Sequence, residues 1–238
     1  MIFLPLDIPP IPNKQSIVNN FSGQTRIVGK NILDESKRVI FSKWQNERLL
    51  ENNTWSKLVL KYPGLVEWID MYFPFETKIA VILYRSIGSI TPHTDNKWDT
   101  SRKQYSDDEW AVIYSTGEYV RSSQYSSIQL QKYVIDHQLA NEPIGYRFIV
   151  SGSRNSLYMC DQVDNQKKIF CSVPENTDAY VMNHCTQPHG LDIRPDIDDE
   201  RLVGFIYGIV NVKQHQELLE KSKNKYSKQV ITENELRV

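Results

Sequence analysis

Short apolar runs separated by turn residues recur along the chain from Thr77 onward. Seven of these runs are rich in Val, Ile, Tyr and Phe, which is typical of β-strands, and Gly, Pro, Asn and Asp punctuate them. Many short strands in succession predict an antiparallel sandwich or barrel rather than βαβ units. The predicted strands are residues 77–87, 109–115, 146–152, 155–163, 167–173, 178–184 and 201–210.

The first 76 residues and the tail follow a different pattern. Residues 1–30 are rich in proline and then polar, so we expect them to wrap the surface as extended chain. Apolar residues at helical spacing predict one helix over residues 36–50 and a second over residues 64–73. The charged segment 213–229 favours a surface helix or a frayed end.

Composition and charge are those of an ordinary soluble globular protein. Hydrophobic residues make up 40% and charged residues 24%, and the net charge is −1. This balance gives no overall basic field for nucleic acid or an anionic membrane. No window approaches the roughly 18 apolar residues of a membrane span, and the proline-rich start lacks the basic region of a signal peptide. We therefore expect a cytoplasmic protein.

The three cysteines, Cys160, Cys171 and Cys185, are widely spaced and form no C-x-x-C pair. This spacing indicates neither a disulfide framework nor a cysteine zinc site. We expect the three thiols to be small buried apolar groups.

The first candidate for chemistry is the triplet His93-Thr94-Asp95 at the end of an apolar run. In an extended chain, residues i and i+2 point to the same face, so an imidazole and a carboxylate could bind one ion together. The triplet alone is weak, because chance supplies it often in a chain with 5 histidines.

A second histidine strengthens this interpretation. His189 precedes an apolar run that opens with Arg201. Two histidines and a carboxylate leave three positions open on Fe(II), which suits a bidentate 2-oxo acid and O₂. A buried Arg is the right partner for the distal carboxylate of that acid. His184, followed by Arg194, is a rival; we prefer His189 because Arg194 precedes Pro195 in a predicted loop.

The order of H-x-D, a distal His and a following Arg resembles the Fe(II)/2-oxoglutarate-dependent dioxygenases. Over residues 77–211 the pattern of strands, turn residues and the distal His is most similar to the aspartyl/asparaginyl β-hydroxylase group. The resemblance implies a mainly β fold with flanking helices, built on a double-stranded β-helix (jelly-roll or cupin-like) barrel. It implies that His93, Asp95 and His189 hold Fe(II) and that Arg201 binds the 5-carboxylate of 2-oxoglutarate. Arg147, in the run YRFIVSG, becomes a candidate for a second contact to cosubstrate or substrate.

The expected activity is hydroxylation of a C–H bond in an amino acid, a peptide or a small metabolite, with release of succinate and CO₂. Two alternatives remain open. One is a catalytically silent jelly roll that serves as a binding or structural module, because fold does not imply function. The other is a cupin-like metalloenzyme that uses no 2-oxoglutarate, in which Arg201 would point away from the metal.

We expect a single domain in three parts. Residues 1–76 would pack on the barrel, residues 77–212 would form the catalytic core, and residues 213–238 would be the charged helix or tail. The separation of 96 positions between His93 and His189 is long for a compact barrel, so we place an insertion near residues 99–140. Long loops of this kind often serve as lids or substrate-binding elements.

Other conspicuous polar and aromatic residues have simpler interpretations. The expected surface residues are His137 and His215, the expected loop charges are Arg121 and Arg154, and the aromatic residues expected in the core are Trp98 and Tyr158.

Overall fold

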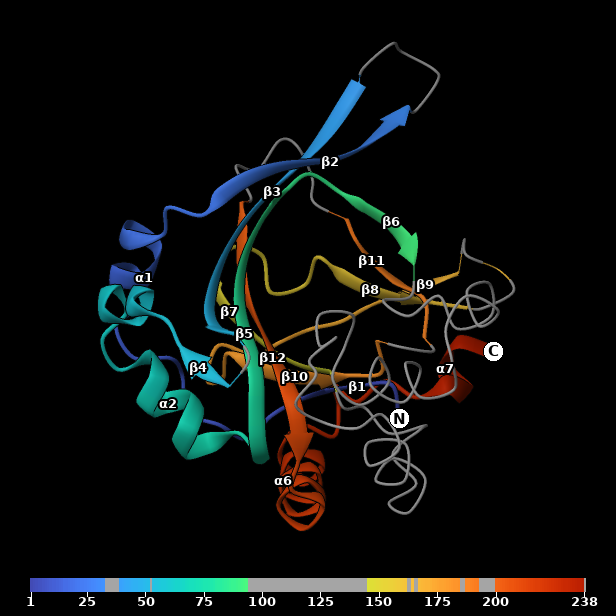
Figure 1. Cartoon of the computed structure of the whole chain (residues 1–238). Coiled ribbons are helices and arrows are strands. Elements are labelled where there is room, and N and C mark those ends of the chain that lie inside the picture. The colour runs from blue at the N-terminus through green and yellow to red at the C-terminus, as the bar shows by residue number, and fades with distance from the viewer. Residues whose placement is uncertain are drawn as a thin grey trace, which may run out of the picture.

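The computed structural model describes residues 1–32, 39–51, 53–93, 145–161, 164, 167–184, 187–192 and 200–237. These residues form a mainly β protein with two antiparallel sheets and a few helices (Figure 1). The strands are β1 (Phe3–Pro5), β2 (Gln24–Ile32), β3 (Val39–Glu51), β4 (Thr54–Trp55), β5 (Phe75–Ile87), β6 (Ile90–His93), β7 (Gly145–Ser151), β8 (Leu157–Cys160), β9 (Lys168–Phe170), β10 (Ala179–Met182), β11 (His189–Leu191) and β12 (Arg201–Val210). The helices are α1 (Lys14–Asn20), η1 (Lys57–Lys61), α2 (Leu65–Tyr72), α6 (Val212–Lys225) and α7 (Glu233–Arg237).

The larger sheet has 8 strands in the order β1-β10-β7-β12-β5-β3-β2, with β4 paired to β3. The smaller sheet has 4 strands in the order β6-β11-β8-β9. The chain passes from the larger to the smaller sheet between β5 and β6, where Gly88 has a φ of 93°. That left-handed conformation suits glycine, so Gly88 permits the turn that separates the two strands.

Alternation along the strands divides the core into two clusters. On β12, Leu202 and Ile206 belong to the cluster on the helix-covered face, whereas Val203 and Tyr207 belong to the cluster between the two sheets. The period of two residues along a strand therefore sorts the side chains between two hydrophobic layers.

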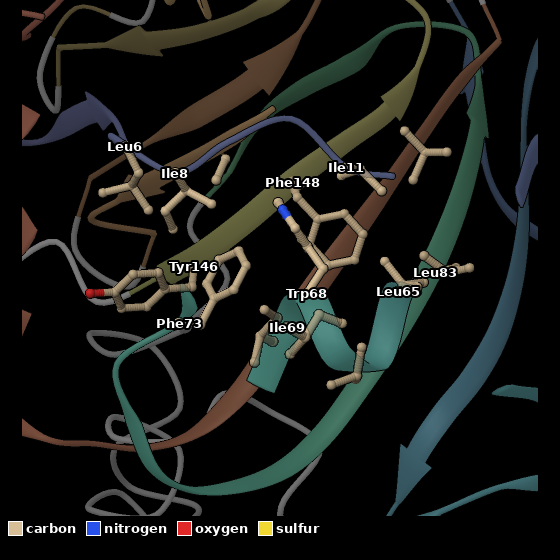
Figure 2. Packing of buried hydrophobic residues seen from close by; sticks show 14 of the residues in the cluster. Leu6, Ile8, Ile11, Leu65, Trp68, Ile69, Phe73, Leu83, Tyr146 and Phe148 are labelled. Atoms are coloured by element: carbon tan, nitrogen blue, oxygen red, sulfur yellow. The ribbon is translucent and has the colours of Figure 1, made fainter. Parts of the chain in front are cut away.

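Helix α2 covers the outer face of the larger sheet. Trp68 and Phe73 meet Phe148 of β7 with ring centroids 5.5 and 6.3 Å apart, and the Trp68 indole N–H donates to the Pro9 carbonyl at 2.9 Å. Figure 2 shows these rings packed with Leu6, Ile8 and Ile11 of the N-terminal segment.

The cluster between the sheets has members from both. It joins Ala80, Ile82 and Tyr84 of β5, together with residues of β7, β10 and β12, to Leu157 and Met159 of β8 and Leu191 of β11.

The described parts of six predicted strands are confirmed, while the run 109–115 lies outside the described residues. Helix α2 and the surface helix α6 are confirmed as well.

The helix expected over residues 36–50 is wrong. Residues 39–51 form β3, which pairs with β2 on one side and with β5 on the other. Helix propensity is a weak preference, and tertiary context overrides it here because two neighbouring strands satisfy the backbone of β3.

The N-terminal segment is not a surface wrap. Residues 2 to 6 include Ile2, Phe3 and Leu4, each with 0% exposure. Strand β1 pairs with β10, and Phe3 also bridges to Ile231 near the C-terminus.

In the part of the chain that the structure describes, no helix is long and apolar enough to cross a membrane.

Candidate functional site

His93 and His189 lie opposite each other on adjacent strands of the smaller sheet. Their Cα atoms are register partners in the β6–β11 pair, and their ring centroids are 4.7 Å apart. His93 is half-buried and His189 is buried. The structure therefore brings together two of the three predicted metal ligands, which are 96 residues apart in the chain.

A β-bulge creates this pairing. Leu191 faces Ile90, and His189 faces His93, so two residue steps on β11 match three steps on β6. Without the extra residue, Ile90 and His93 would point to opposite faces of the sheet. The bulge turns His93 to the side of Ile90, which packs on the cluster between the sheets. Bulges commonly re-aim a side chain in this way.

Both imidazoles are oriented by backbone carbonyls. Nδ1 of His93 lies 2.9 Å from the Thr91 carbonyl oxygen, and Nδ1 of His189 lies 3.0 Å from that of Gln187. A carbonyl only accepts, so Nδ1 carries the hydrogen in both rings. Nε2 is then the basic nitrogen of each neutral ring, which is the arrangement that metal-binding histidines use.

The spacing of the two rings fits one shared metal ion. Two imidazoles bound at about 2.1 Å and at a right angle place their centroids about 4.6 Å apart. The observed 4.7 Å separation agrees, and the 47° tilt between the planes is not a stacked arrangement. Among the described residues, no group of three or more His, Cys, Asp or Glu side chains is close enough to hold a metal ion. Asp95, the predicted third ligand, lies outside them.

Arg201 supplies a buried positive charge at the start of β12. It is 3% exposed. Because Arg201 and Val203 are two residues apart on β12, their side chains point to the same face, toward the interface between the sheets. A terminal nitrogen of its guanidinium donates to the Tyr180 hydroxyl at 3.2 Å, whereas its Nε is buried without a hydrogen-bond partner in the described structure. Burial raises the pKa of the Cys171 thiol, and the neighbouring Arg201 charge opposes that shift. This donor set fits a carboxylate, which would accept from the buried Nε.

Arg147 shares the interior with Arg201. It is 2% exposed, and its guanidinium carbon lies 4.0 Å from the ring centroid of Phe205 and 5.8 Å from that of Tyr207. The guanidinium also donates to the Tyr146 carbonyl at 3.2 Å. Aromatic faces stabilise a cation, so two rings of the neighbouring strand β12 hold Arg147 in place.

His184, the rival to His189, lies elsewhere. It directly follows Asn183 at the end of β10, a strand of the larger sheet, and its ring packs against Gly145. His189 is instead the cross-strand partner of His93. Arg194, which would accompany His184, lies outside the described residues.

Two residues interpreted as solvated are buried or paired. His215 is 1% exposed, and its Nδ1 lies 2.6 Å from the Tyr146 hydroxyl. Arg154 donates to the buried Asp178 carboxylate at 2.9 Å. The expected surface position of His215 is therefore wrong, whereas Arg154 lies in a loop, as expected, with its charge paired rather than solvated. His137, Arg121, Trp98 and Cys185 lie outside the described residues, as does the insertion expected near residues 99–140. Cys160 and Cys171 are buried, as expected.

Sequence reasoning missed the residues that support the site. Gln187 holds its segment through a side-chain hydrogen bond to the Cys160 carbonyl, and Tyr180 contacts Arg201. The strands expected from the sequence do not include residues 189–191, yet His189–Leu191 form β11. A run of three strand residues is too short to give a periodicity signal. Tyr158 was expected in the core and is buried, with its hydroxyl donating to the Ile90 carbonyl at 3.1 Å.

Comparison with known proteins adds no assignment. No family model matches the chain, and no curated protein is significantly similar to it. The functional interpretation therefore depends on the residues and their geometry.

Proposed function

We propose that the protein is an Fe(II)- and 2-oxoglutarate-dependent oxygenase. The observation that carries the proposal is the pair of histidines at metal-sharing distance, with both Nδ1 atoms directed at carbonyls. Arg201 adds a buried cation whose Nε has no hydrogen-bond partner among the described residues. A buried charge of this kind requires an anionic partner, which a 2-oxo dicarboxylic acid provides.

We propose further that β5 to β12 form a double-stranded β-helix. In support, among the described strands from β5 to β12, each strand lies in a different sheet from the one before it, except β9, which lies in the same sheet as β8. Each sheet takes four of these strands, in the orders β10-β7-β12-β5 and β6-β11-β8-β9, and all of the pairings are antiparallel. This alternation is typical of a jelly roll.

His93, Asp95 and His189 would hold the metal, Asp95 on the strength of the sequence pattern alone. When bound, Fe(II) supplies the oxygen chemistry by which 2-oxoglutarate, O₂ and a C–H group become succinate, CO₂ and a C–OH group. The protein residues bind, orient and exclude water. Arg201 would fix the 5-carboxylate, Tyr180 would hold the Arg201 guanidinium, and Arg147 would contact cosubstrate or substrate. The substrate class is an amino acid, a peptide or a small metabolite.

An anaerobic titration with Fe(II) and 2-oxoglutarate tests this function. Chelation of a 2-oxo acid to Fe(II) gives a visible charge-transfer band. We expect the band in the wild type and in His184→Ala, no band in His93→Ala or His189→Ala, and a band in Arg201→Ala only at higher 2-oxoglutarate concentration. His184→Ala is the matched control, because it removes a buried imidazole that lies after β10, away from the β6–β11 pair.

The outcomes separate the alternatives. A folded wild type that binds Fe(II) without the band would contradict the 2-oxoglutarate function and favour a metalloenzyme without cosubstrate. A folded wild type that binds no metal would favour the silent jelly roll. A band that persists in His189→Ala and disappears in His184→Ala would contradict the choice of distal ligand.

A further inference from the structure

Strand β6, which carries His93, is weakly held by its own sheet. It is the edge strand of the smaller sheet and pairs only with β11 among the described strands. Pro92 removes one backbone donor from it, and the bulge between Ile90 and His93 interrupts the hydrogen-bond ladder. The position of His93 therefore requires support from outside the β6–β11 ladder.

A tyrosine two strands away supplies that support. Tyr158 belongs to β8, where it is the cross-strand partner of Gly190 in β11. Its hydroxyl passes over Gly190 and donates to the Ile90 carbonyl of β6 at 3.1 Å. The side chain thereby ties three neighbouring strands together at the residue where the bulge begins.

Gly190 makes this crossing possible. A Cβ atom at Gly190 would lie 2.3 Å from the Tyr158 hydroxyl oxygen and 2.5 Å from the Ile90 carbonyl oxygen. Any side chain at this position would occupy the space through which the phenol reaches β6. The hydrogen bond between Tyr158 and the Ile90 carbonyl thus explains why the residue after His189 is a glycine.

The ring of Tyr158 is itself held in place. Tyr158 is 2% exposed, its ring centroid lies 5.9 Å from that of Phe170, and the Lys168 ammonium lies 4.4 Å from its ring centroid. Both neighbours come from β9, the next strand of the sheet. Met159 of the same strand faces the opposite side and pairs with His189. Tyr158 therefore acts from the face of the sheet opposite to the two imidazoles.

We propose that Tyr158 is a positioning residue for His93, acting through the Ile90 carbonyl across Gly190. Its hydroxyl fixes the start of the bulge, and the next carbonyl in the bulge, that of Thr91, orients the His93 ring at 2.9 Å. This role rests on the proposed function where it concerns metal binding, but the orientation of His93 can be tested without metal. Tyr158 touches neither the metal nor the cosubstrate in this proposal.

The test compares Tyr158→Phe with Tyr226→Phe. Both variants remove one hydroxyl hydrogen bond from a buried tyrosine, but the Tyr226 hydroxyl donates to Asn176 at 3.2 Å, away from β6. Co(II), which does not oxidise in air as Fe(II) does, serves as the metal probe in a calorimetric titration. We expect Tyr158→Phe to raise the Kd for Co(II) about 10- to 100-fold, as loss of an orienting partner commonly does, and Tyr226→Phe to leave it within about twofold.

Imidazole ¹⁵N resonances of the metal-free proteins provide the second readout. Tyr158→Phe should move the His93 resonances toward a mixture of tautomers and leave those of His215 unchanged. Equal Kd values in the two variants, with unchanged His93 resonances, would overturn the proposal. If the wild type binds no Co(II), the proposed function fails, and the His93 resonances alone decide whether Tyr158 positions this ring.

Discussion

Arg201 places a full positive charge between two sheets, and among the described residues its one side-chain hydrogen bond is to a neutral hydroxyl. Its Nε has no hydrogen-bond partner in the described structure, and its one neutral partner there is the Tyr180 hydroxyl. An unsatisfied buried donor costs about 1–3 kcal/mol of stability. Such a cost is understandable where the residue serves an anionic ligand, since functional sites often sacrifice stability.

Replacement of Arg201 by Met should therefore separate binding from stability. We expect Arg201→Met to raise the KM or Kd for 2-oxoglutarate at least about tenfold, because a charged hydrogen bond of about 1.5–3 kcal/mol is lost. The ligand-free variant should be at least as stable as the wild type in urea unfolding, because the buried charge is removed. Arg48→Met, at a partly exposed arginine paired with Glu51, is the control for both measurements. Equal 2-oxoglutarate affinity in Arg201→Met would contradict this role.

For single residues, the sequence predicted which side chains are suited to bind a metal, but it did not predict which other polar side chains are buried. His93, His189 and Arg201 could be selected because their side chains suit one chemistry and their order suits one fold. The burial of His215 could not be predicted, because its partner Tyr146 is 69 residues away. The pairing of Arg154 with Asp178 has the same cause, since two loops must meet before either charge is satisfied.

Helix α6 carries a buried histidine, His215, whose titration makes the stability of the fold depend on pH. Burial, with a smaller contribution from the Lys223 charge, lowers the pKa of His215 to about 4. The unfolded chain has the ordinary value of about 6.5, so it binds more protons than the folded chain between these pH values. Acidification through this window therefore destabilises the fold.

We expect wild-type stability to fall by about 2 kcal/mol more than that of His215→Gln between pH 7 and pH 4.5. Glutamine can accept from the Tyr146 hydroxyl but does not titrate, so it preserves the contact and removes the proton uptake. Urea unfolding at several pH values measures the difference. Parallel stability profiles for the two proteins would show that His215 titrates normally in the fold.

The elements also divide into those that local pattern specifies and those that pairing specifies. Strand β12 was predictable because its own residues are rich in Val, Ile, Phe and Tyr, and helix α2 because its apolar residues recur at helical spacing. Strand β3 was not, since its residues suit a helix until β2 and β5 are present on either side. Strand β11 has three residues, and the β6 bulge depends on its register with β11, so neither leaves a local signal.

At the scale of the whole molecule, the first strand contacts a residue of the candidate site. Strand β1 extends the larger sheet beyond β10, and Phe3 contacts Tyr180 with ring centroids 5.5 Å apart. Tyr180 in turn accepts from Arg201. A segment that the sequence predicted to lie on the surface thus packs behind the residues proposed to bind the cosubstrate.

Truncation of Phe3 should consequently affect both stability and binding. Phe3 has 0% exposure, so Phe3→Ala should lower the free energy of unfolding by about 3–5 kcal/mol. Leu60→Ala, at a side chain with 82% exposure, is the control and should change stability little. Because the cavity would loosen Tyr180, the folded fraction of Phe3→Ala should also bind 2-oxoglutarate less tightly than the wild type, with metal affinity unchanged. If Phe3→Ala loses stability but keeps wild-type 2-oxoglutarate affinity, the N-terminal strand serves the fold alone; if metal affinity falls equally, the disturbance has spread beyond Tyr180 to the histidine pair.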